Sequence, residues 1–358
     1  MYVVIMAGGK GTRFWPQSRE RLPKHLLDIL SNKTVIRETV DRIKPLLPAE
    51  RILIVTASSH VDAMFEQLPD IPRENILIEP LGRNTAPCIG LAALYLRKRA
   101  PDDVMIVLPA DHCIDDAGRF RHTLAAAADM ARKETYLLTV GIVPTGPETG
   151  YGYLERGELV ATIRGEAVYK VNSIREKPSR EQAEAFLRQR GYLWNSGMFI
   201  WKVSAILEAI ARHLPGLYDQ LQQIEQALDT DHEKALLDRL YPAIEPISID
   251  YGVMEKSDNV LVLEGDFGWS DVGSWDTLWE ISAKDERGNA FKGAGPFVGI
   301  DTRNSLIISP NKLVALVGIE DLLVIETGDA ILICRRGASQ AVKKVVETIE
   351  AENWTEFL

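Results

Sequence analysis

Hydrophobic positions in the first part of the chain follow two alternating patterns. Short continuous runs rich in Val, Ile and Leu predict buried strands at Tyr2–Met6, Arg51–Thr56, Asn75–Glu79, Val104–Leu108 and Thr135–Val140. Between these runs, apolar residues recur at helical spacing and predict helices at about Thr34–Leu46, His60–Gln67, Pro87–Arg99 and Phe120–Lys133. Apolar strands that alternate with helices indicate βαβ units and a parallel sheet covered on both faces. The pattern therefore predicts an α/β fold, in which ligands bind beyond the carboxyl ends of the strands.

The pattern is less regular in the middle of the chain, where a cluster of Gly, Pro and Thr at Val143–Gly152 interrupts it. Strands are then predicted at Tyr151–Glu155, Ala167–Arg175, Met198–Trp201, Ser248–Val253 and Val260–Glu264. Helices are predicted at Arg180–Gln189, throughout residues 203–240, and at Trp275–Ala283.

A polar, Gly-rich segment at Lys284–Gly295 divides the chain into two predicted domains, residues 1–285 and residues 286–358. The short β-runs that follow are spaced as in a small all-β unit. They lie at Phe297–Ile300, Ser305–Ile308, Leu313–Val317, Leu322–Glu326 and Ala330–Cys334. With a closing helix at Ser339–Ala351, the predicted architecture is an α/β domain followed by a small β-rich domain.

Composition and charge exclude several classes of protein. The 358 residues are 46% hydrophobic and 26% charged, which is typical of a globular protein. The formal net charge of −10 argues against a general nucleic-acid binder. No stretch approaches the ~20 apolar residues of a membrane span, and the N-terminus lacks the basic region of a signal peptide. The three cysteines form no CxxC pair, so no zinc ribbon or disulfide framework is expected. A cytoplasmic protein without nucleic-acid or membrane partners is therefore predicted.

A glycine-rich loop directly follows the first predicted strand. Its glycines let backbone N–H groups approach an anion, and its lysine and arginine add positive charge. The loop does not match GxxxxGK[ST], because Gly11 follows Lys10, and it does not match GxGxxG, because Phe14 stands where a glycine is needed. A phosphate-binding loop is therefore predicted at Ala7, Gly8, Gly9, Lys10, Gly11, Thr12 and Arg13. Lys24, which follows Pro23, is a candidate further cation.

Two aspartates are candidates for a metal site. Asp111 follows a buried strand that ends in Leu108-Pro109-Ala110. A carboxylate at the carboxyl end of a parallel strand is well placed to hold Mg²⁺ jointly with substrate phosphates. Asp271, in the run GWSDVGSW, is the second candidate. These two residues are distant in the sequence, so only folding can bring them together.

The sequence GGKGTR, followed by PK, resembles the signature of the sugar-1-phosphate nucleotidyltransferases. This resemblance implies the Rossmann-like nucleotide-diphospho-sugar transferase fold, with a mixed, mainly parallel sheet flanked by helices. It also implies that Asp111 and Asp271 together bind Mg²⁺. Arg13 and Lys24 would then stabilise charge on the triphosphate, which makes these two cations and the two aspartates the expected catalytic residues.

Three further motifs resemble the sugar-binding parts of the same family. In Glu176-Lys177-Pro178, the carboxylate can accept hydrogen bonds from sugar hydroxyls and the lysine can pair with the phosphate. The run Tyr151-Gly152-Tyr153 resembles the family's glycine motif, and Trp194-Asn195-Ser196-Gly197 resembles its sugar-pocket motif. The resemblance implies a sugar-phosphate site made by Gly152, Glu176, Lys177 and Asn195.

The runs EPLGRNTAP and GWSDVGSW together resemble the mannose-1-phosphate guanylyltransferases. This resemblance implies a nucleotide site that includes Glu79, Arg83, Asn84, Thr85 and Pro109 beside the phosphate loop and Asp111. The run SIDYGVME matches as well, and its Asp250 is a candidate metal or sugar-pocket carboxylate. The β-runs after Phe297 resemble the short left-handed β-helix of such enzymes, which commonly takes part in dimer contacts, so a homodimer is expected.

The reaction implied by the resemblance transfers GMP from GTP to α-D-mannose 1-phosphate and yields GDP-mannose and pyrophosphate, with Mg²⁺. The sugar phosphate would attack the α-phosphorus in line. One alternative is another pair of substrates, such as glucose 1-phosphate with UTP or dTTP. A second alternative is a non-catalytic subunit that senses sugar nucleotides. The missing GxGxxG fingerprint argues against a dinucleotide-dependent oxidoreductase.

Overall fold

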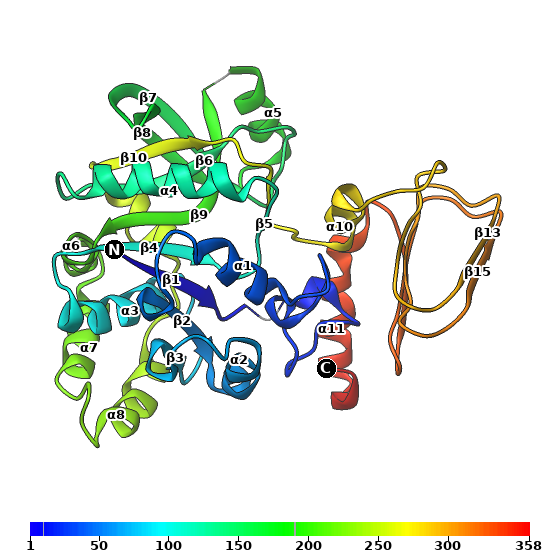
Figure 1. The fold of residues 1–358 in the computed structure, drawn as a ribbon, viewed down its shortest axis with the longest axis horizontal. Coiled ribbons are helices and arrows are strands. Elements are labelled where there is room, and N and C mark those ends of the chain that lie inside the picture. Colours follow the sequence, from blue (N-terminus) through cyan, green and yellow to red (C-terminus); the bar gives the residue numbers. More distant parts are fainter. Residues whose placement is uncertain (10, 190) are drawn as a thin grey trace. The chain divides into compact units, whose positions relative to one another are not determined.

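A computed structural model describes residues 1–9, 11–189 and 191–358 (Figure 1). These residues form two compact units, each assembled from separate segments. The larger unit comprises Met1–Gly8, Thr39–Ala110 and Ile114–Trp269, and the smaller unit comprises Gly9–Glu38, Asp111–Cys113 and Ser270–Leu358. These two compact units do not follow the predicted division at residue 285, because the smaller unit also includes residues from near the N-terminus.

The larger unit is built on a mixed sheet, with nine strands in the described residues. The strand order is β3-β2-β1-β4-β9-β6-β10-β8-β7, and β9 also pairs with β7. Strands β8 and β9 run opposite to the others, so the sheet is mainly parallel in direction. The strands are β1 (Tyr2–Ala7), β2 (Ile52–Ala57), β3 (Ile76–Glu79), β4 (Val104–Pro109), β6 (Leu137–Ile142), β7 (Gly152–Ile163), β8 (Glu166–Glu176), β9 (Tyr192–Lys202) and β10 (Val260–Gly265).

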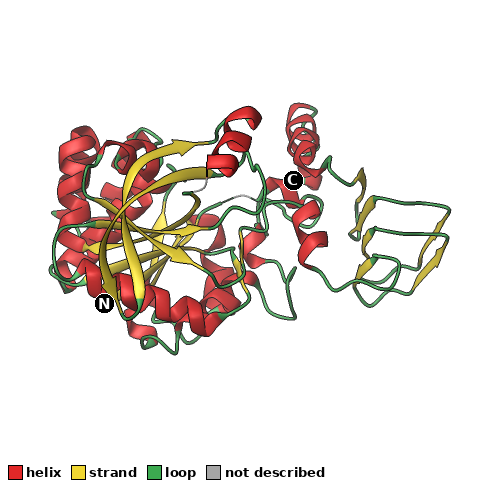
Figure 2. Ribbon diagram, turned by 90° about the horizontal axis from the view of Figure 1, so that it is seen from above, coloured by secondary structure: helices red, strands yellow, loops and turns green. Residues whose placement is uncertain are grey.

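Helices cover both faces of this sheet (Figures 1 and 2). The helices up to residue 252 are α1 (Val35–Ile43), α2 (Val61–Gln67), α3 (Thr85–Arg99), α4 (Ala117–Ala131), α5 (Arg180–Gln189), α6 (Val203–His213), α7 (Pro215–Glu225), α8 (Glu233–Leu240) and α9 (Ile249–Gly252). Ile89 of α3, Ile206 of α6 and Leu221 of α7 are fully buried in one core with residues of the sheet. Because both faces of the sheet are covered, consecutive strand residues such as Val3, Val4 and Ile5 are all buried, which explains the continuous apolar runs in the sequence.

Most predicted elements are present with ends shifted by a few residues, but one has the wrong type. Residues Ser248–Val253, predicted as a strand, contain the helix α9. The Ser248 hydroxyl accepts a hydrogen bond from Tyr251 N at 3.2 Å, and this N-cap favours a helical turn over extended backbone. The helix predicted throughout residues 203–240 is divided into α6, α7 and α8. Pro215 separates α6 from α7, because it disfavours helical backbone at Leu214 before it. Asp229, with a φ of 63°, lies between α7 and α8.

The C-terminal strands of the smaller unit form two small sheets. One contains β12 (Ala290–Lys292), β14 (Leu306–Ile308), β16 (Leu322–Glu326) and β17 (Ile331–Arg335), and only its β16–β17 pair is antiparallel. The other is the parallel pair of β13 (Phe297–Ile300) and β15 (Val314–Val317). Successive strands from β12 to β16 alternate between the two sheets, as in a β-helix. Strand β12 lies within the segment that was predicted to be a linker.

The core of the smaller unit joins the phosphate-loop region to the C-terminal elements. Phe14 packs edge-on against Trp275, the first residue of α10 (Trp275–Ile281), with ring centroids 4.7 Å apart. Val342, Val346 and Ile349 of α11 (Val342–Ala351) belong to the same buried cluster. The two remaining strands are β5 (Cys113–Ile114) and β11 (Trp269–Ser270). The short 3₁₀ helices are η1 (Thr12–Phe14), η2 (Lys24–Leu26), η3 (Ala49–Arg51), η4 (Ser58–His60), η5 (Arg73–Asn75), η6 (Tyr241–Ala243), η7 (Met254–Lys256), η8 (Ser339–Ala341) and η9 (Thr355–Phe357).

Two further sequence predictions can be compared with the structure. Within the described ranges, no helix is both long enough and apolar enough to cross a lipid bilayer. The three cysteines are free thiols, of which Cys88 is buried while Cys113 and Cys334 are half-buried.

Candidate active site

The predicted phosphate loop begins at the end of β1. Ala7 is buried there and its carbonyl accepts a hydrogen bond from the Thr56 hydroxyl at 3.2 Å, whereas Gly8 and Gly9 are exposed. Lys10 lies outside the described residues. Gly8 lies against Glu79, since a Cβ at this position would be 3.3 Å from Glu79 Oε2.

Gly11 has a backbone shape that only glycine adopts readily. Its φ of 63° is in the left-handed region, and it precedes η1. A Cβ at Gly11 would lie 2.5 Å from Lys24 Cβ, so the glycine also lets Lys24 approach. Within η1, Thr12 is half-buried and the Arg13 side chain is exposed.

Lys24 is buried and its ammonium group is held by oxygen atoms from two distant parts of the smaller unit. Lys24 Nζ donates to the Asp111 carboxylate at 2.9 Å and to the Asp111 main-chain carbonyl at 3.0 Å. It also donates to the main-chain carbonyl of Asp271 at 2.6 Å. The chain thus brings Asp111 and Asp271 to one cation, although their positions in the sequence are far apart.

The two aspartates line one cavity together with the cations. This cavity has a volume of about 250 Å³, and it is lined by Gly11, Thr12, Arg13, Phe14, Lys24, Asp111, His112, Asp271 and Gly273. Asp271 Oδ1 accepts a hydrogen bond from Gly273 N at 3.1 Å, and a Cβ at Gly273 would lie 2.7 Å from Asp271 Oδ2. Burial opposes ionisation of Asp111, but the charges of Lys24 and His112 outweigh it and lower the pKa of this carboxyl to about 2. The cavity therefore holds an ionised carboxylate at neutral pH.

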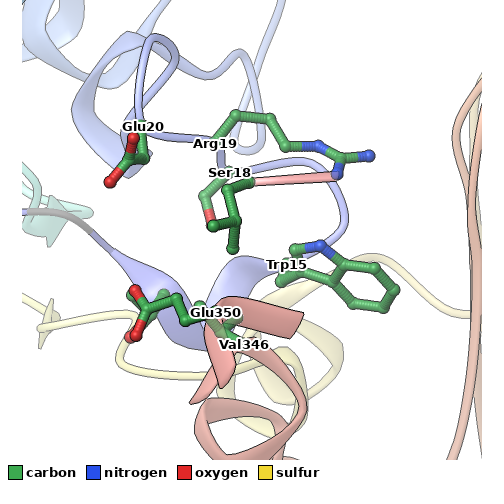
Figure 3. Close-up of a pocket in the computed structure, with 8 residues that line it drawn as sticks. Trp15, Ser18, Arg19, Glu20, Val346 and Glu350 are labelled. Carbon is green, nitrogen blue, oxygen red and sulfur yellow. The ribbon is translucent and has the colours of Figure 1, made fainter. Parts of the chain in front are cut away.

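The residues that follow η1 pack against the C-terminal part of the smaller unit. Figure 3 shows Trp15, Ser18 and Arg19 beside Val346 and Glu350 of α11. Trp15 Nε1 donates to the Phe357 carbonyl at 2.9 Å, and Arg19 donates to the same carbonyl. Trp275 Nε1 donates to the Trp15 carbonyl at 3.0 Å. The backbone around η1 is thus held by several elements that were not predicted to contact it.

In the larger unit, three of the four predicted sugar-site residues form one cluster. A Cβ at Gly152, the first residue of β7, would overlap Glu176 Oε2 at the end of β8, and it would lie 3.3 Å from Asn195 Cβ on β9. Glu176 Oε1 lies 3.4 Å from the ammonium group of Lys177, whose side chain is 63% exposed. Asp250, at the start of α9, accepts a hydrogen bond from Asn195 Nδ2 at 2.6 Å. Aromatic rings lie close by, since Tyr151 packs edge-on against Trp194.

The predicted base-binding loop is anchored to the segment 241–249 of the larger unit. The Tyr241 hydroxyl donates to buried Glu79, Arg83 donates to the Pro242 carbonyl, and Thr85 Oγ1 accepts from Ile249 N at 2.8 Å. Burial raises the pKa of Glu79 to about 7, although the hydrogen bond from Tyr241 lowers it in part.

Asn84 and Pro109 complete the predicted nucleotide site. The Asn84 side chain is exposed and caps α3, because its Oδ1 accepts a hydrogen bond from Thr85 N at 2.8 Å. Pro109 lies near Gly197, where an added Cβ would be 3.7 Å from Pro109 Cγ.

Some residues that shape these sites have no recognisable signal in the local sequence. Tyr241 and Trp15 carry no local motif, and their partners Glu79 and Phe357 are distant in the chain. Asp250 was assigned only as a candidate carboxylate, because nothing local indicates that it contacts Asn195.

Two family models match successive parts of the chain. A family model described as "Nucleotidyl transferase" matches residues 2–288, and one described as "MannoseP isomerase/GMP-like beta-helix domain" matches residues 295–349. A mannose-1-phosphate guanylyltransferase of Escherichia coli (strain K12) is 40% identical over 98% of this chain and 74% of its own length. One from Klebsiella pneumoniae is 40% identical over 99% of this chain and 75% of its own length.

A solved structure is similar over nearly the whole chain. The protein from Thermus thermophilus, named mannose-1-phosphate geranyltransferase, has a TM-score of 0.88 and 34% identity, over 98% of this chain and 99% of its own. Its fold is therefore that of the present chain, β-helix-like end included. The chain belongs to the nucleotidyl transferase family, in the group of the mannose-1-phosphate guanylyltransferases. Members of the nucleotidyl transferase family generally use a divalent metal.

Proposed function

We propose that this chain transfers GMP from GTP to α-D-mannose 1-phosphate and releases GDP-mannose and pyrophosphate. A phosphate oxygen of the sugar phosphate attacks the α-phosphorus of GTP, and the bond from that phosphorus to the pyrophosphate oxygen breaks. No protein nucleophile is needed, because the substrate supplies the attacking oxygen. The observation that carries the proposal is the cavity where Arg13, Lys24, Asp111 and Asp271 meet. The names of the relatives support GTP and mannose 1-phosphate as the substrates.

The cations of the cavity act on the triphosphate. Arg13 has an exposed side chain, and a guanidinium group binds phosphate oxygens through two parallel hydrogen bonds. The Lys24 ammonium is already held by Asp111 and Asp271, so it does not have to reorganise as charge develops on the leaving pyrophosphate. Backbone N–H groups of the loop from Ala7 to Thr12 supply further donors to the phosphates.

Asp111 and Asp271 fit a Mg²⁺ ion. Both line the same cavity, and carboxylate oxygens are the ligands that Mg²⁺ prefers. Mg²⁺ usually keeps several water ligands and is bound through one or two carboxylates together with substrate phosphates, so two aspartates are enough to hold it. When bound, Mg²⁺ would neutralise charge on the phosphate oxygens of the substrates.

The cluster around Gly152 binds the sugar phosphate. Glu176 and Asn195 offer an acceptor and a donor for hydroxyls, and the absence of a side chain at Gly152 lets Glu176 lie across the start of β7. The exposed Lys177 ammonium is 3.4 Å from Glu176 and pairs with the phosphate of the sugar. For the guanine base, we assign the loop that carries Glu79, Arg83, Asn84 and Thr85, with Pro109 also in the nucleotide site.

Pyrophosphate release tests this proposal when it is measured over a matrix of nucleoside triphosphates and sugar 1-phosphates, with Mg²⁺ and with a chelator. We expect metal-dependent release that is fastest for GTP with mannose 1-phosphate. A maximum for glucose 1-phosphate with UTP or dTTP would keep the chemistry and change the substrates. No release from folded protein that still binds nucleotide would indicate a sensing subunit instead.

Three other properties stay predictions. Homodimer formation is tested by light scattering of the purified chain, and a cytoplasmic location is tested by cell fractionation. The boundary between a catalytic domain ending near residue 285 and a β-rich C-terminal domain is tested by limited proteolysis.

A further inference from the structure

Asp250 is an acidic residue that the roles assigned above do not use. It lies in the first turn of α9 and is half-buried. Its Oδ1 accepts a hydrogen bond of 2.6 Å from Nδ2 of Asn195 on β9. Because this is the shortest contact of the Asn195 side chain, Asp250 is the group that most strongly affects how the Asn195 amide is oriented.

The partners of Asn195 define which way round its amide lies. Asn195 Oδ1 accepts from Gly197 N at 3.3 Å, and a backbone N–H can only donate. The Thr139 hydroxyl is also 3.3 Å from this oxygen, but it lies closer to the Met198 carbonyl, at 2.9 Å, and has one hydrogen to donate. On the other side, an ionised Asp250 can only accept. If the amide were rotated by half a turn, its NH₂ group would face the Gly197 N–H, and its oxygen would face the Asp250 carboxylate. Neither pair could form a hydrogen bond. One N–H of Asn195 is left for another partner.

Asp250 and Glu176 face the same small region. Glu176 lies against Gly152, where an added Cβ would overlap it and would be 3.3 Å from Asn195 Cβ. Asp250 reaches the same region through its hydrogen bond to Asn195. Burial and then the charge of Glu176 raise the pKa of Asp250 to about 6, and Glu255 adds to this effect. Two carboxylates at one place disfavour an anionic group and favour hydroxyls, which donate hydrogen bonds to them.

We propose that Asp250 is a positioning residue of the sugar pocket, which holds the Asn195 amide so that its remaining N–H faces a hydroxyl of the hexose. This inference rests on the proposed function, because it takes the sugar 1-phosphate as the occupant of the pocket. It assigns Asp250 to the sugar and not to the metal or to the nucleotide.

Asp250→Asn is the test variant. Asparagine has nearly the same shape, but its amide can donate or accept, so only the Gly197 N–H then restricts the orientation of the Asn195 amide. The variant replaces a charged acceptor with a neutral one, so we expect KM for mannose 1-phosphate to rise about 10-fold. KM for GTP should stay within about 2-fold and kcat should fall less than KM rises, because Asp250 touches neither the triphosphate site nor the reacting atoms. Equal rises in both KM values, or an unchanged KM for the sugar, would overturn the proposal.

Two further variants separate positioning from a general structural effect. Glu255→Gln is the matched control, because Glu255 is exposed and acts on Asp250 only through its charge, and both KM values should stay within about 2-fold. Asp250→Glu keeps an ionised acceptor and should restore part of the affinity that Asp250→Asn loses. If Asp250→Asn does not fold, a KM for the sugar that is unchanged in Asp250→Ala overturns the proposal instead.

A double-mutant cycle shows whether Asp250 acts through Asn195. Asp250→Ala should add little to the KM of Asn195→Ala, since the amide that it orients is already gone. Additive effects would mean that Asp250 acts independently, and the proposal would be wrong. Wild-type protein is assayed in parallel, and its failure to use any sugar 1-phosphate would count against the proposed function and not specifically against the role of Asp250.

Discussion

Lys24→Met removes the cation at the centre of the candidate active site. In the wild-type chain, Lys24 Nζ contacts the Asp111 carboxylate at 2.9 Å and the main-chain carbonyls of Asp111 and Asp271 at 3.0 and 2.6 Å. Methionine is similar in length and keeps an apolar side chain near the Phe14 ring, over which Nζ lies at 5.5 Å from the centroid. The variant therefore removes the charge and its hydrogen bonds with little change in packing.

The size of the effect follows from the burial of the two partners. Removing one member of a buried ion pair typically costs about 3–5 kcal/mol, because the other charge is left without compensation. The Lys24 side chain is 6% exposed but that of Asp111 is 36% exposed, so water screens part of the remaining charge. We therefore expect the free energy of unfolding to fall by about 2–3 kcal/mol at pH 7.

The loss should depend on pH in a defined direction. Lys24 is the largest of the charges that overcome burial and lower the pKa of Asp111 to about 2. A carboxyl with a lowered pKa stabilises the fold above its usual pKa near 3.8, and this contribution is lost as pH falls toward 2. Without Lys24, burial is opposed less, the pKa of Asp111 rises, and protonation relieves the uncompensated charge. The difference in stability between wild type and variant should thus be largest at pH 7 and smaller at pH 4.

Urea unfolding followed by tryptophan fluorescence measures this difference at both pH values. Lys234→Met is the control, because Lys234 is 87% exposed and pairs with Asp238 on the same helix, and it should change stability by less than about 0.5 kcal/mol. A Lys24→Met chain with wild-type stability, or with the same loss at pH 7 and pH 4, would refute this view of the cluster. The turnover of the variant should also fall about 100-fold or more.

Three other substitutions have defined outcomes. Asp271→Ala should abolish nearly all pyrophosphate release while the circular dichroism spectrum is kept, and a near-normal rate would remove Asp271 from the mechanism. Burial raises the pKa of Glu79 from 4.5 to about 7, so the folded state retains a proton that the unfolded state has lost, and wild-type stability falls as pH rises through this interval. Glu79→Gln has no carboxyl that titrates here, so its stability relative to wild type should increase by up to about 3 kcal/mol between pH 4 and pH 8 in urea unfolding. If the pH profiles of the two proteins are parallel, the raised pKa of Glu79 is contradicted. Arg19→Ala removes the hydrogen bond to the Phe357 carbonyl and the 2.8 Å ion pair with Asp329, so the free energy of unfolding should fall by about 1–2 kcal/mol in thermal unfolding. An unchanged melting temperature would show that these contacts do not stabilise the smaller unit.

Local patterns predicted the fold well where periodicity and burial agree. The helix α5 was predicted with the same ends, Arg180–Gln189, and β16 was predicted at Leu322–Glu326. The prediction for Ser248–Val253 was wrong, because a run this short does not distinguish the helical period from the strand period. The N-cap hydrogen bond from Tyr251 N to the Ser248 hydroxyl favours the helical turn that the structure has. Strand β9 begins at Tyr192, earlier than predicted, because its pairing with β6 and β7 is set by distant chain.

The candidate site was predictable as a set of chemical groups but not as a set of contacts. Motifs identified Lys24, Asp111 and Asp271, whereas their meeting at one ammonium group depends on folding of the smaller unit. The same holds in the larger unit, where Asp250 lies in a recognisable motif but the sequence does not indicate its hydrogen bond to Asn195. Periodicity reports which face of an element is buried, and it carries no information on which distant side chain lies opposite.

The transfer of GMP from GTP to the sugar phosphate is tested most directly by ³¹P NMR of the reaction mixture. Purified chain is mixed with GTP, mannose 1-phosphate and Mg²⁺, and all phosphorus species are followed together. GDP-mannose and pyrophosphate should appear in equal amounts as both substrates disappear, and a chelator should stop all four changes. Orthophosphate or pyrophosphate without a sugar nucleotide, or unchanged substrates in the presence of folded protein, would contradict the account.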